Sequence, residues 1–292
     1  MMSQETVGVI GLGLMGSALA ERLLAASYSV LGHDIDTASC EALLRIGGDV
    51  AANHADVAAR CDRIVLSLPT TDIVEDVIGQ MGAALRSGQV IIDTTTGNPQ
   101  RTAALGARLA ERNVGYLDAT LSGSSAQARK GDIVVMAGGR REVFDVCEDI
   151  FRSCARRWFH VGDWGSGNRM KLVSNLVLGL NRAALAEALA FAKVLGLDPE
   201  VTLSILAASA AYSRVMDTKG QKMIAGDFTP QAKLSQHLKD VRLILAEGSR
   251  AGVDLPLSAL HRQLLEGLEA AGLGDLDNSA IIRAFDANKQ EH

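Results

Sequence analysis

The sequence lacks the features that mark secreted, metal-binding and nucleic-acid-binding proteins. Its 292 residues include four cysteines, none in a CxxC pair or in a Cys/His set with zinc spacing. Neither a disulfide framework nor a metal site is therefore expected. The net charge is -5 and no run of like charges occurs, so nothing suggests binding to nucleic acid or to an anionic membrane. Small molecules or other proteins are the expected partners.

Long apolar runs are also missing. The opening stretch MMSQETVGVIG has no basic region before an apolar core, and no uninterrupted apolar run approaches the roughly 18 residues of a membrane span. We therefore predict a cytoplasmic protein with no membrane segment. Aromatic residues make up only 4% of the chain, while alanine, leucine and glycine are common, which favours helices and tight turns. The length predicts about two domains.

The motifs of hydrolytic enzymes are absent too. The sequence has no GxSxG, no HExxH and no pair of carboxylates at a spacing that indicates a catalytic pair. The histidines are scattered, and we interpret the following as structural or surface residues: His33, His54, His160, His237 and His261. An acid or base for catalysis must therefore be sought among other residue types.

Strands alternate with helices in the first half of the chain. Residues 6–10 form a β-branched run, followed by the GLGLMG string at 11–16 and a helical pattern through Leu24. A second strand at 28–33 ends at Asp34. Further apolar runs lie at 63–67, 90–92, 114–117 and 133–137, and helical patterns at 72–86, 99–112 and 141–153. This order predicts an α/β Rossmann domain with a mostly parallel, doubly wound sheet.

Strand signals stop after residue 161, and the remaining chain is helical in pattern. We place the boundary near Gly162, with residues 1–162 as the dinucleotide-binding domain and 163–292 as an all-helical domain for substrate binding and dimerisation. A nearly all-apolar helix over about 168–195, roughly 40 Å long, would join them. Lys171 and Asn175 lie near its start on one face, since they are four residues apart. Taken alone, such a lysine is most often a surface residue.

The GxGxxG string stands in the context that a dinucleotide site needs, after a strand and at the start of a helix. Gly11 would make the tight turn, Gly13 would let the backbone approach a pyrophosphate, and Gly16 would let helix pack on strand. The N–H groups and dipole at the helix start favour a phosphate. The predicted cofactor-binding turn consists of Gly11, Leu12, Gly13, Leu14, Met15 and Gly16.

Asp34 follows the second strand, where a carboxylate can accept hydrogen bonds from both hydroxyls of the adenosine ribose. The alternative is a solvated aspartate at a strand end. Because its charge would repel a 2′-phosphate, and no arginine follows before Arg45, NAD is favoured as the cofactor, with NADP as the alternative.

Polar segments follow three later strands, where open α/β sheets bind their ligands. Those at 67–71 and 93–98 are equally compatible with plain loops. The third, 118–127, is predicted to be a loop whose hydroxyls, amide and backbone N–H groups can hold a carboxylate; the alternative is a helix start capped by serine. Lys171 fits a proton-transferring role if its site desolvates it, because burial lowers the pKa of a lysine.

Five segments occur together and in one order: GLGLMG, DTTT at 93–96, residues 118–139, GSGNRMKLVSN at 165–175, and Lys239-Asp240. Together they resemble the β-hydroxyacid dehydrogenases over essentially the whole chain. The resemblance implies a Rossmann domain joined through a long helix to an all-α domain, an active site between the domains, and a homodimer or homotetramer.

The resemblance also assigns roles to individual residues. It implies that Lys171 is catalytic with Asn175 as its hydrogen-bonding partner, and that Lys239 lies near cofactor and substrate. Ser122 and Gly123 would begin the loop that binds the substrate carboxylate, and Ser124 follows them. The cofactor would further contact Leu68, Pro69 and Thr96.

The sequence departs from the family pattern on the substrate side. The residues from Thr120 to Ser124 replace the common PVSGG, and Gln127 stands where many members have glycine. Ala232, beside Lys233, replaces a common aromatic residue, which leaves room for a larger or more anionic substrate. We therefore predict a dehydrogenase that acts on a small β-hydroxy acid and its semialdehyde, a small-molecule carboxylate that we do not name further.

Three alternative functions are less well supported by the sequence. A non-catalytic dinucleotide-binding sensor or scaffold is a different class of protein, and retention of Lys171 and Asn175 argues against it. Imine reductases usually replace the catalytic lysine. The 6-phosphogluconate dehydrogenases usually have histidine before the asparagine, where this chain has Ser174.

Overall fold

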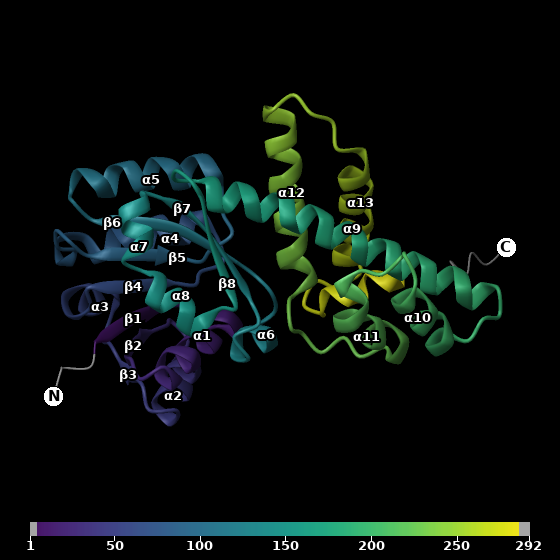
Figure 1. Cartoon of the computed structure of the whole chain (residues 1–292), viewed down its shortest axis with the longest axis horizontal. Coiled ribbons are helices and arrows are strands. Elements are labelled where there is room, and N and C mark those ends of the chain that lie inside the picture. The colour runs from purple at the N-terminus through teal and green to yellow at the C-terminus, as the bar shows by residue number, and fades with distance from the viewer. Residues whose placement is uncertain (1–4, 286–292) are drawn as a thin grey trace. The chain divides into compact units, whose positions relative to one another are not determined.

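The computed structural model describes residues 5–285 of the chain (Figure 1). Two compact units divide at Lys171 and Leu172, within one long helix. Each unit has its own hydrophobic core.

The first unit is built on an eight-stranded sheet with the order β3-β2-β1-β4-β5-β6-β7-β8. All neighbouring strands are parallel except β6 and β7, which are antiparallel. The mostly parallel, doubly wound sheet of the prediction is thus confirmed. The strands are β1 Thr6–Ile10, β2 Ser29–His33, β3 Asp49–Val50, β4 Arg63–Leu66, β5 Val90–Asp93, β6 Gly115–Ser122, β7 Val134–Gly139 and β8 Arg157–Gly162.

Helices cover both faces of this sheet, which explains why its central strands are almost continuously apolar. In β1, Val7 and Val9 join the core on one face, and Ile10 joins the core on the other. The helices are α1 Leu14–Ala25, α2 Thr37–Arg45, α3 His54–Arg60, α4 Thr71–Met81, η1 Gly82–Ala84, α5 Pro99–Glu111, α6 Ser125–Arg129, α7 Arg141–Asp145 and α8 Glu148–Cys154.

Two predicted boundaries in this unit are wrong. The pattern at 141–153 is two short helices, α7 and α8, separated at Val146 and Cys147. The strand predicted at 114–117 continues to Ser122, because residues 117–122 pair with β7, so the first half of the predicted loop 118–127 is strand.

The described residues of the second unit form helices and connecting loops without a strand, apart from an isolated bridge between Lys233 and Asp277. Its elements are most of α9 Ser166–Val194, then α10 Pro199–Ala208, η2 Met216–Gly220, α11 Gln221–Ala225, α12 Leu234–Arg250, α13 Pro256–Ala270 and η3 Asn278–Phe285. The all-helical second domain and the long helix near 168–195 are confirmed.

Helix α9 is long and apolar enough to cross a membrane by length and composition, the one such helix among the described residues. However, Leu185, Ala186 and Leu189 pack into the core of the second unit, and the helix contains the charged Lys171 and Arg182. One face of α9 therefore belongs to the core of the second unit.

Candidate active site

Protein packing accounts for two of the three glycines in the turn after β1. Gly11 has a φ of +89°, and a Cβ there would lie 2.3 Å from the carbonyl oxygen of Ser67. A Cβ at Gly16 would lie 1.8 Å from the carbonyl oxygen of Gly11. At Gly13, by contrast, no described atom outside the adjoining backbone lies within 4 Å of the Cβ position. Open space beside this backbone is what the close approach of a pyrophosphate requires.

The start of α1 is available for an anion. Among the described residues no side chain caps this helix start, and its first turn has no acidic residue. The N–H groups of the first turn, with the helix dipole, can therefore bind a phosphate.

Asp34 is fixed beside the same turn. Its Oδ2 accepts a hydrogen bond from the Leu12 N–H at 2.6 Å, and its Oδ1 accepts one from the Asp36 N–H at 2.8 Å. The carboxylate is therefore held in place rather than freely solvated at the strand end. A fixed carboxylate next to the glycine turn suits the recognition of ribose hydroxyls.

Most of the predicted cofactor residues share one edge of the sheet. Strands β1, β2, β4, β5 and β6 are parallel to one another, so their carboxyl ends meet there. Four of these strand ends are followed by predicted cofactor residues: β1 by the glycine turn, β2 by Asp34, β4 by Leu68-Pro69 and β5 by Thr96. The fifth strand, β6, ends at Ser122. A hydrogen bond from the Leu68 N–H to the Thr95 hydroxyl, 3.2 Å, ties two of the loops together.

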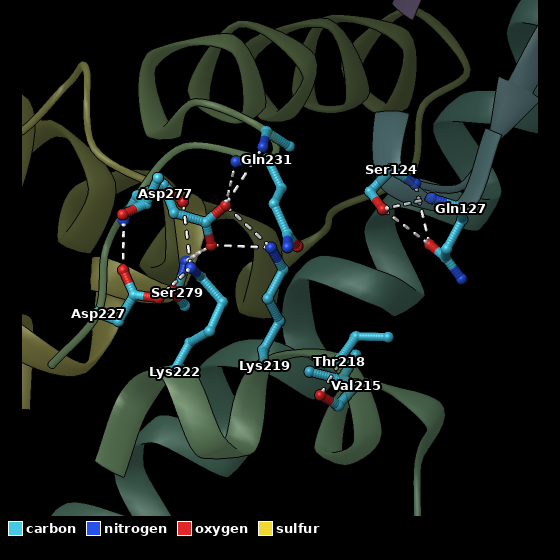
Figure 2. Close-up of polar contacts among 12 residues, drawn as sticks. Ser124, Gln127, Val215, Thr218, Lys219, Lys222, Asp227, Gln231, Asp277 and Ser279 are labelled. Atoms are coloured by element: carbon cyan, nitrogen blue, oxygen red, sulfur yellow. Dashed lines mark hydrogen bonds and ion pairs between the residues drawn. The ribbon is translucent and has the colours of Figure 1, made fainter. Parts of the chain in front are cut away.

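The segment after β6 begins a short helix. Gly123 has a φ of +145°, and α6 follows with a capping box: Ser124 Oγ accepts from the Gln127 N–H at 3.3 Å, and Gln127 Oε1 accepts from the Ser124 N–H at 2.9 Å (Figure 2). Ser124 and Gln127 thus form the serine-capped helix start that the sequence offered as the alternative to a carboxylate-binding loop. Ser122 lies at the strand end and takes no part in this cap.

Lys171 is buried at the carboxyl end of β6. It is 9% exposed, and its Nζ donates a hydrogen bond to the Leu121 carbonyl oxygen at 2.6 Å. Because Leu121 precedes the last residue of β6, the ammonium group lies at the edge that also holds the glycine turn. A buried amine at this edge is unlike the surface lysine that is the commoner case.

The first turn of α9 is held by a residue that sequence reasoning missed. The carboxylate of Asp118, fully buried in β6, accepts hydrogen bonds from the N–H groups of Gly165 at 3.0 Å and Asn168 at 2.8 Å. Burial raises the pKa of Asp118 to about 7. Asn168 in turn accepts from the Gly97 N–H at 2.6 Å. These contacts set the position of the turn that precedes Lys171.

In the second unit, α9 and α12 bring two predicted residues, Asn175 and Lys239, to the same carboxylate, that of Asp240. Asn175 Nδ2 donates to Asp240 Oδ2 at 2.8 Å, and Lys239 Nζ lies 3.3 Å from Asp240 Oδ1. The hydrogen bond expected between Lys171 and Asn175 stays a prediction. Lys233 pairs with Asp275 at 2.8 Å and is half exposed.

Family models match both parts of the chain. Residues 6–162 match the NAD binding domain of 6-phosphogluconate dehydrogenase, and residues 165–285 match the NAD-binding model of NADP-dependent 3-hydroxyisobutyrate dehydrogenase. The chain is 36% identical to 2-(hydroxymethyl)glutarate dehydrogenase of Eubacterium barkeri, over 96% of this chain and 94% of that protein. The chain belongs to the β-hydroxyacid dehydrogenase family.

Other similar proteins agree with this membership. The chain is 31% identical to 2-hydroxy-3-oxopropionate reductase of Escherichia coli, over 96% of this chain and 97% of that protein. It matches the crystal structure of 3-hydroxyisobutyrate dehydrogenase from Salmonella typhimurium with a TM-score of 0.89 and 27% identity, covering 96% and 99% of the two chains. The family makes the chain an NAD(P)-dependent oxidoreductase of hydroxy acids and does not support the non-catalytic alternative.

Proposed function

We propose that this β-hydroxyacid dehydrogenase transfers a hydride between NAD and a small β-hydroxy acid or its semialdehyde, with Lys171 as the general acid and base. The observation that carries the proposal is the burial of the Lys171 ammonium at the Leu121 carbonyl, on the sheet edge that holds the glycine turn. A proton-transferring group and a phosphate-binding turn on one edge suit hydride transfer coupled to proton transfer.

The residues at this edge fit a dinucleotide. The open space at Gly13 and the uncapped start of α1 suit its pyrophosphate. Asp34 would bind the adenosine ribose and disfavour the 2′-phosphate of NADP. Leu68, Pro69, Thr96 and Lys239 would contact the remainder. When bound, the nicotinamide gives or takes the hydride at the substrate carbon.

The protein's own groups handle the proton and the carboxylate. In the reductive direction Lys171 would donate a proton to the carbonyl oxygen, and in the oxidative direction it would accept the proton of the hydroxyl. The Leu121 carbonyl accepts one N–H group of the Lys171 ammonium, which holds the ammonium at the end of β6. Asn175 would position lysine and substrate. Ser122, Gly123 and Ser124 would bind the substrate carboxylate through neutral donors. For Ser124 this requires its N–H and hydroxyl to leave Gln127 Oε1, to which both donate.

The first test is the absorbance of reduced nicotinamide with purified protein, NAD or NADP, and a panel of short hydroxy acids that includes branched and sulfonated ones. We expect turnover of a β-hydroxy acid, with kcat/KM about tenfold or more higher for NAD, because Asp34 repels the additional phosphate. Tight binding of NADH without turnover of any hydroxy acid would instead support the non-catalytic alternative.

We further propose that residues 1–162 bind the dinucleotide and residues 163–292 bind substrate and form a homodimer or homotetramer in the cytoplasm.

On α9, the face opposite Asn175 exposes Val173, Val177 and Phe191 by 57%, 52% and 64%. Apolar patches of this kind mark protein contacts. Light scattering should give a multiple of 30.8 kDa, and Val177→Ser with Phe191→Ser should lower it. A monomeric wild type would contradict the proposal.

A further inference from the structure

The start of α2 lies beside the carboxylate that we assign to the adenosine ribose. Asp34 Oδ1 accepts a hydrogen bond from the N–H of Asp36 at 2.8 Å, and Asp36 is the residue that caps α2. Bond lengths therefore keep the two carboxylates within about 8 Å of each other. Asp34 Oδ2 accepts from the N–H of Leu12 in the glycine turn at 2.6 Å. Strand β2, the glycine turn and the start of α2 thus meet at one carboxylate.

The starts of α1 and α2 differ in what their N–H groups contact. No side chain of the described residues caps α1, which suits its proposed contact with the pyrophosphate. At α2, the carboxylate of Asp36 accepts from the Ala38 N–H at 3.2 Å and from the Ser39 hydroxyl at 2.8 Å. These hydrogen bonds, that of Ser39 first, lower the pKa of Asp36 below its usual 3.8, so it is ionised at neutral pH. An anion of the chain itself therefore occupies the start of α2.

Two negative charges lie together here without a paired cation in the described chain. The side chain between Asp34 and Asp36, that of Ile35, is apolar and 93% exposed. Arg45, at the end of α2, forms its salt bridge within that helix. His54 is affected by the charge of Asp34, but burial lowers its pKa below 6.5, so its ring is neutral at pH 7. An additional anion at this place would find repulsion and no counter-charge.

A 2′-phosphate on the adenosine ribose would be such an anion. Like other phosphate monoesters it carries a charge of about −1.5 to −2 at pH 7. The distance of about 8 Å between the two carboxylates equals the Debye length at physiological salt, so repulsion by Asp36 is only partly screened. In addition, a phosphate cannot use the donors of Ala38 and Ser39 unless Asp36 releases them. The uncharged hydroxyls of a plain ribose avoid both effects.

We infer that Asp36 is a second specificity-determining residue for the cofactor, which excludes the 2′-phosphate of NADP independently of Asp34. This inference rests on the proposed function, which binds the adenosine ribose at Asp34 and favours NAD. The two carboxylates differ in role. Asp34 can accept from the ribose hydroxyls and so contributes to binding, whereas the oxygens of Asp36 are bonded to the start of α2 and contribute repulsion alone. Removing the charge of Asp36 should therefore improve binding of the phosphorylated nucleotide without weakening that of the other.

Calorimetric binding of ADP-ribose and of 2′-phospho-ADP-ribose tests the inference without turnover. Asp36→Asn removes the charge and keeps a side-chain oxygen that caps α2, because asparagine caps a helix about as well as aspartate does. In this variant the Kd of 2′-phospho-ADP-ribose should fall by about three- to tenfold, the effect of one partly screened charge. The Kd of ADP-ribose should stay within about twofold. Asp34→Asn should instead raise the Kd of ADP-ribose by about tenfold, since a charged acceptor for the ribose is lost.

Two further variants separate the charge of Asp36 from its capping role. Asp62→Asn makes the same change of charge at an exposed residue before β4, at the amino edge of the sheet, and should leave both Kd values within about twofold. Asp36→Ala removes charge and cap together. It should show at least the gain of Asp36→Asn for the phosphorylated nucleotide and, unlike that variant, a Tm lower by about 2–4 °C. A residue that only caps α2 would show this loss of Tm and no change in either Kd.

The results distinguish the inference from the proposed function. A wild type that prefers ADP-ribose, with the same preference in Asp36→Asn, would overturn the inference and leave NAD specificity to Asp34. A wild type that binds both nucleotides equally would contradict the proposed NAD preference and the inference together, since neither carboxylate then excludes the phosphate. A selective gain in Asp36→Asn, in an enzyme that turns over no hydroxy acid, would support the inference and contradict the proposed catalysis.

Discussion

Replacing Lys171 with alanine is expected to lower kcat by about 10²- to 10⁴-fold, the loss typical of a positioned acid–base group. The reason is that the proton on the substrate oxygen has no other nearby donor in the proposed mechanism. Binding of NADH should change little, because the glycine turn and Asp34 do not depend on this side chain. The measurements are single-turnover hydride transfer and NADH fluorescence titration.

Lys193→Ala is the control for this prediction, because Lys193 is exposed in the last turn of the same helix. It should leave kcat within about twofold, as surface substitutions away from a site usually do. The alanine at 171 also leaves the Leu121 carbonyl without its donor, which costs about 1–3 kcal/mol of stability. A thermal unfolding curve therefore accompanies the kinetics. Near-normal turnover in a folded Lys171→Ala enzyme would refute the assignment.

The parts of the structure that the sequence predicts well are those with local causes. Residues only a few positions apart determine the pattern of the strand before the glycine string and that of the long apolar helix. Both elements are found in the structure. The end of β6 depends instead on pairing with β7, a strand that follows α6 in the sequence. Periodicity alone carries no signal for this pairing, so it predicts a strand only to residue 117.

The missed residues of the candidate site act over long separations. Asp118 accepts from the N–H group of Gly165, 47 residues away, and Asn168 accepts from that of Gly97, 71 residues away. No local spacing rule reports contacts over such separations.

Asp118→Asn should change both the pH dependence of stability and the rate. The folded-state pKa of about 7 is raised by burial above the unfolded value of 3.8. The folded protein therefore retains this proton over a range in which the unfolded chain has lost it, and the contribution to stability falls as pH rises from about 4 to 7. Asparagine does not titrate, so this decline should vanish in the variant. Misplacement of the turn before Lys171 should also lower kcat, by up to about 10²-fold.

Urea unfolding of wild type and Asp118→Asn is measured in steps from pH 4 to pH 8. The difference between their free energies of unfolding isolates the effect of Asp118. Comparing the two proteins is necessary because His261 also makes stability depend on pH. Its pKa is lowered to about 4 in the folded protein, so its contribution to the free energy of unfolding is lost as pH falls below 6.5, the opposite trend to that of Asp118. At pH 4 the variant should be less stable by about 1–3 kcal/mol, since an amide offers one acceptor to two buried N–H groups. The gap should narrow by more than about 1 kcal/mol by pH 7. The exposed Asp62→Asn should show no such trend. A gap that widens with pH would mean that the two N–H donors and the helix dipole outweigh burial, and Asp118 would then hold α9 as a carboxylate at all working pH values.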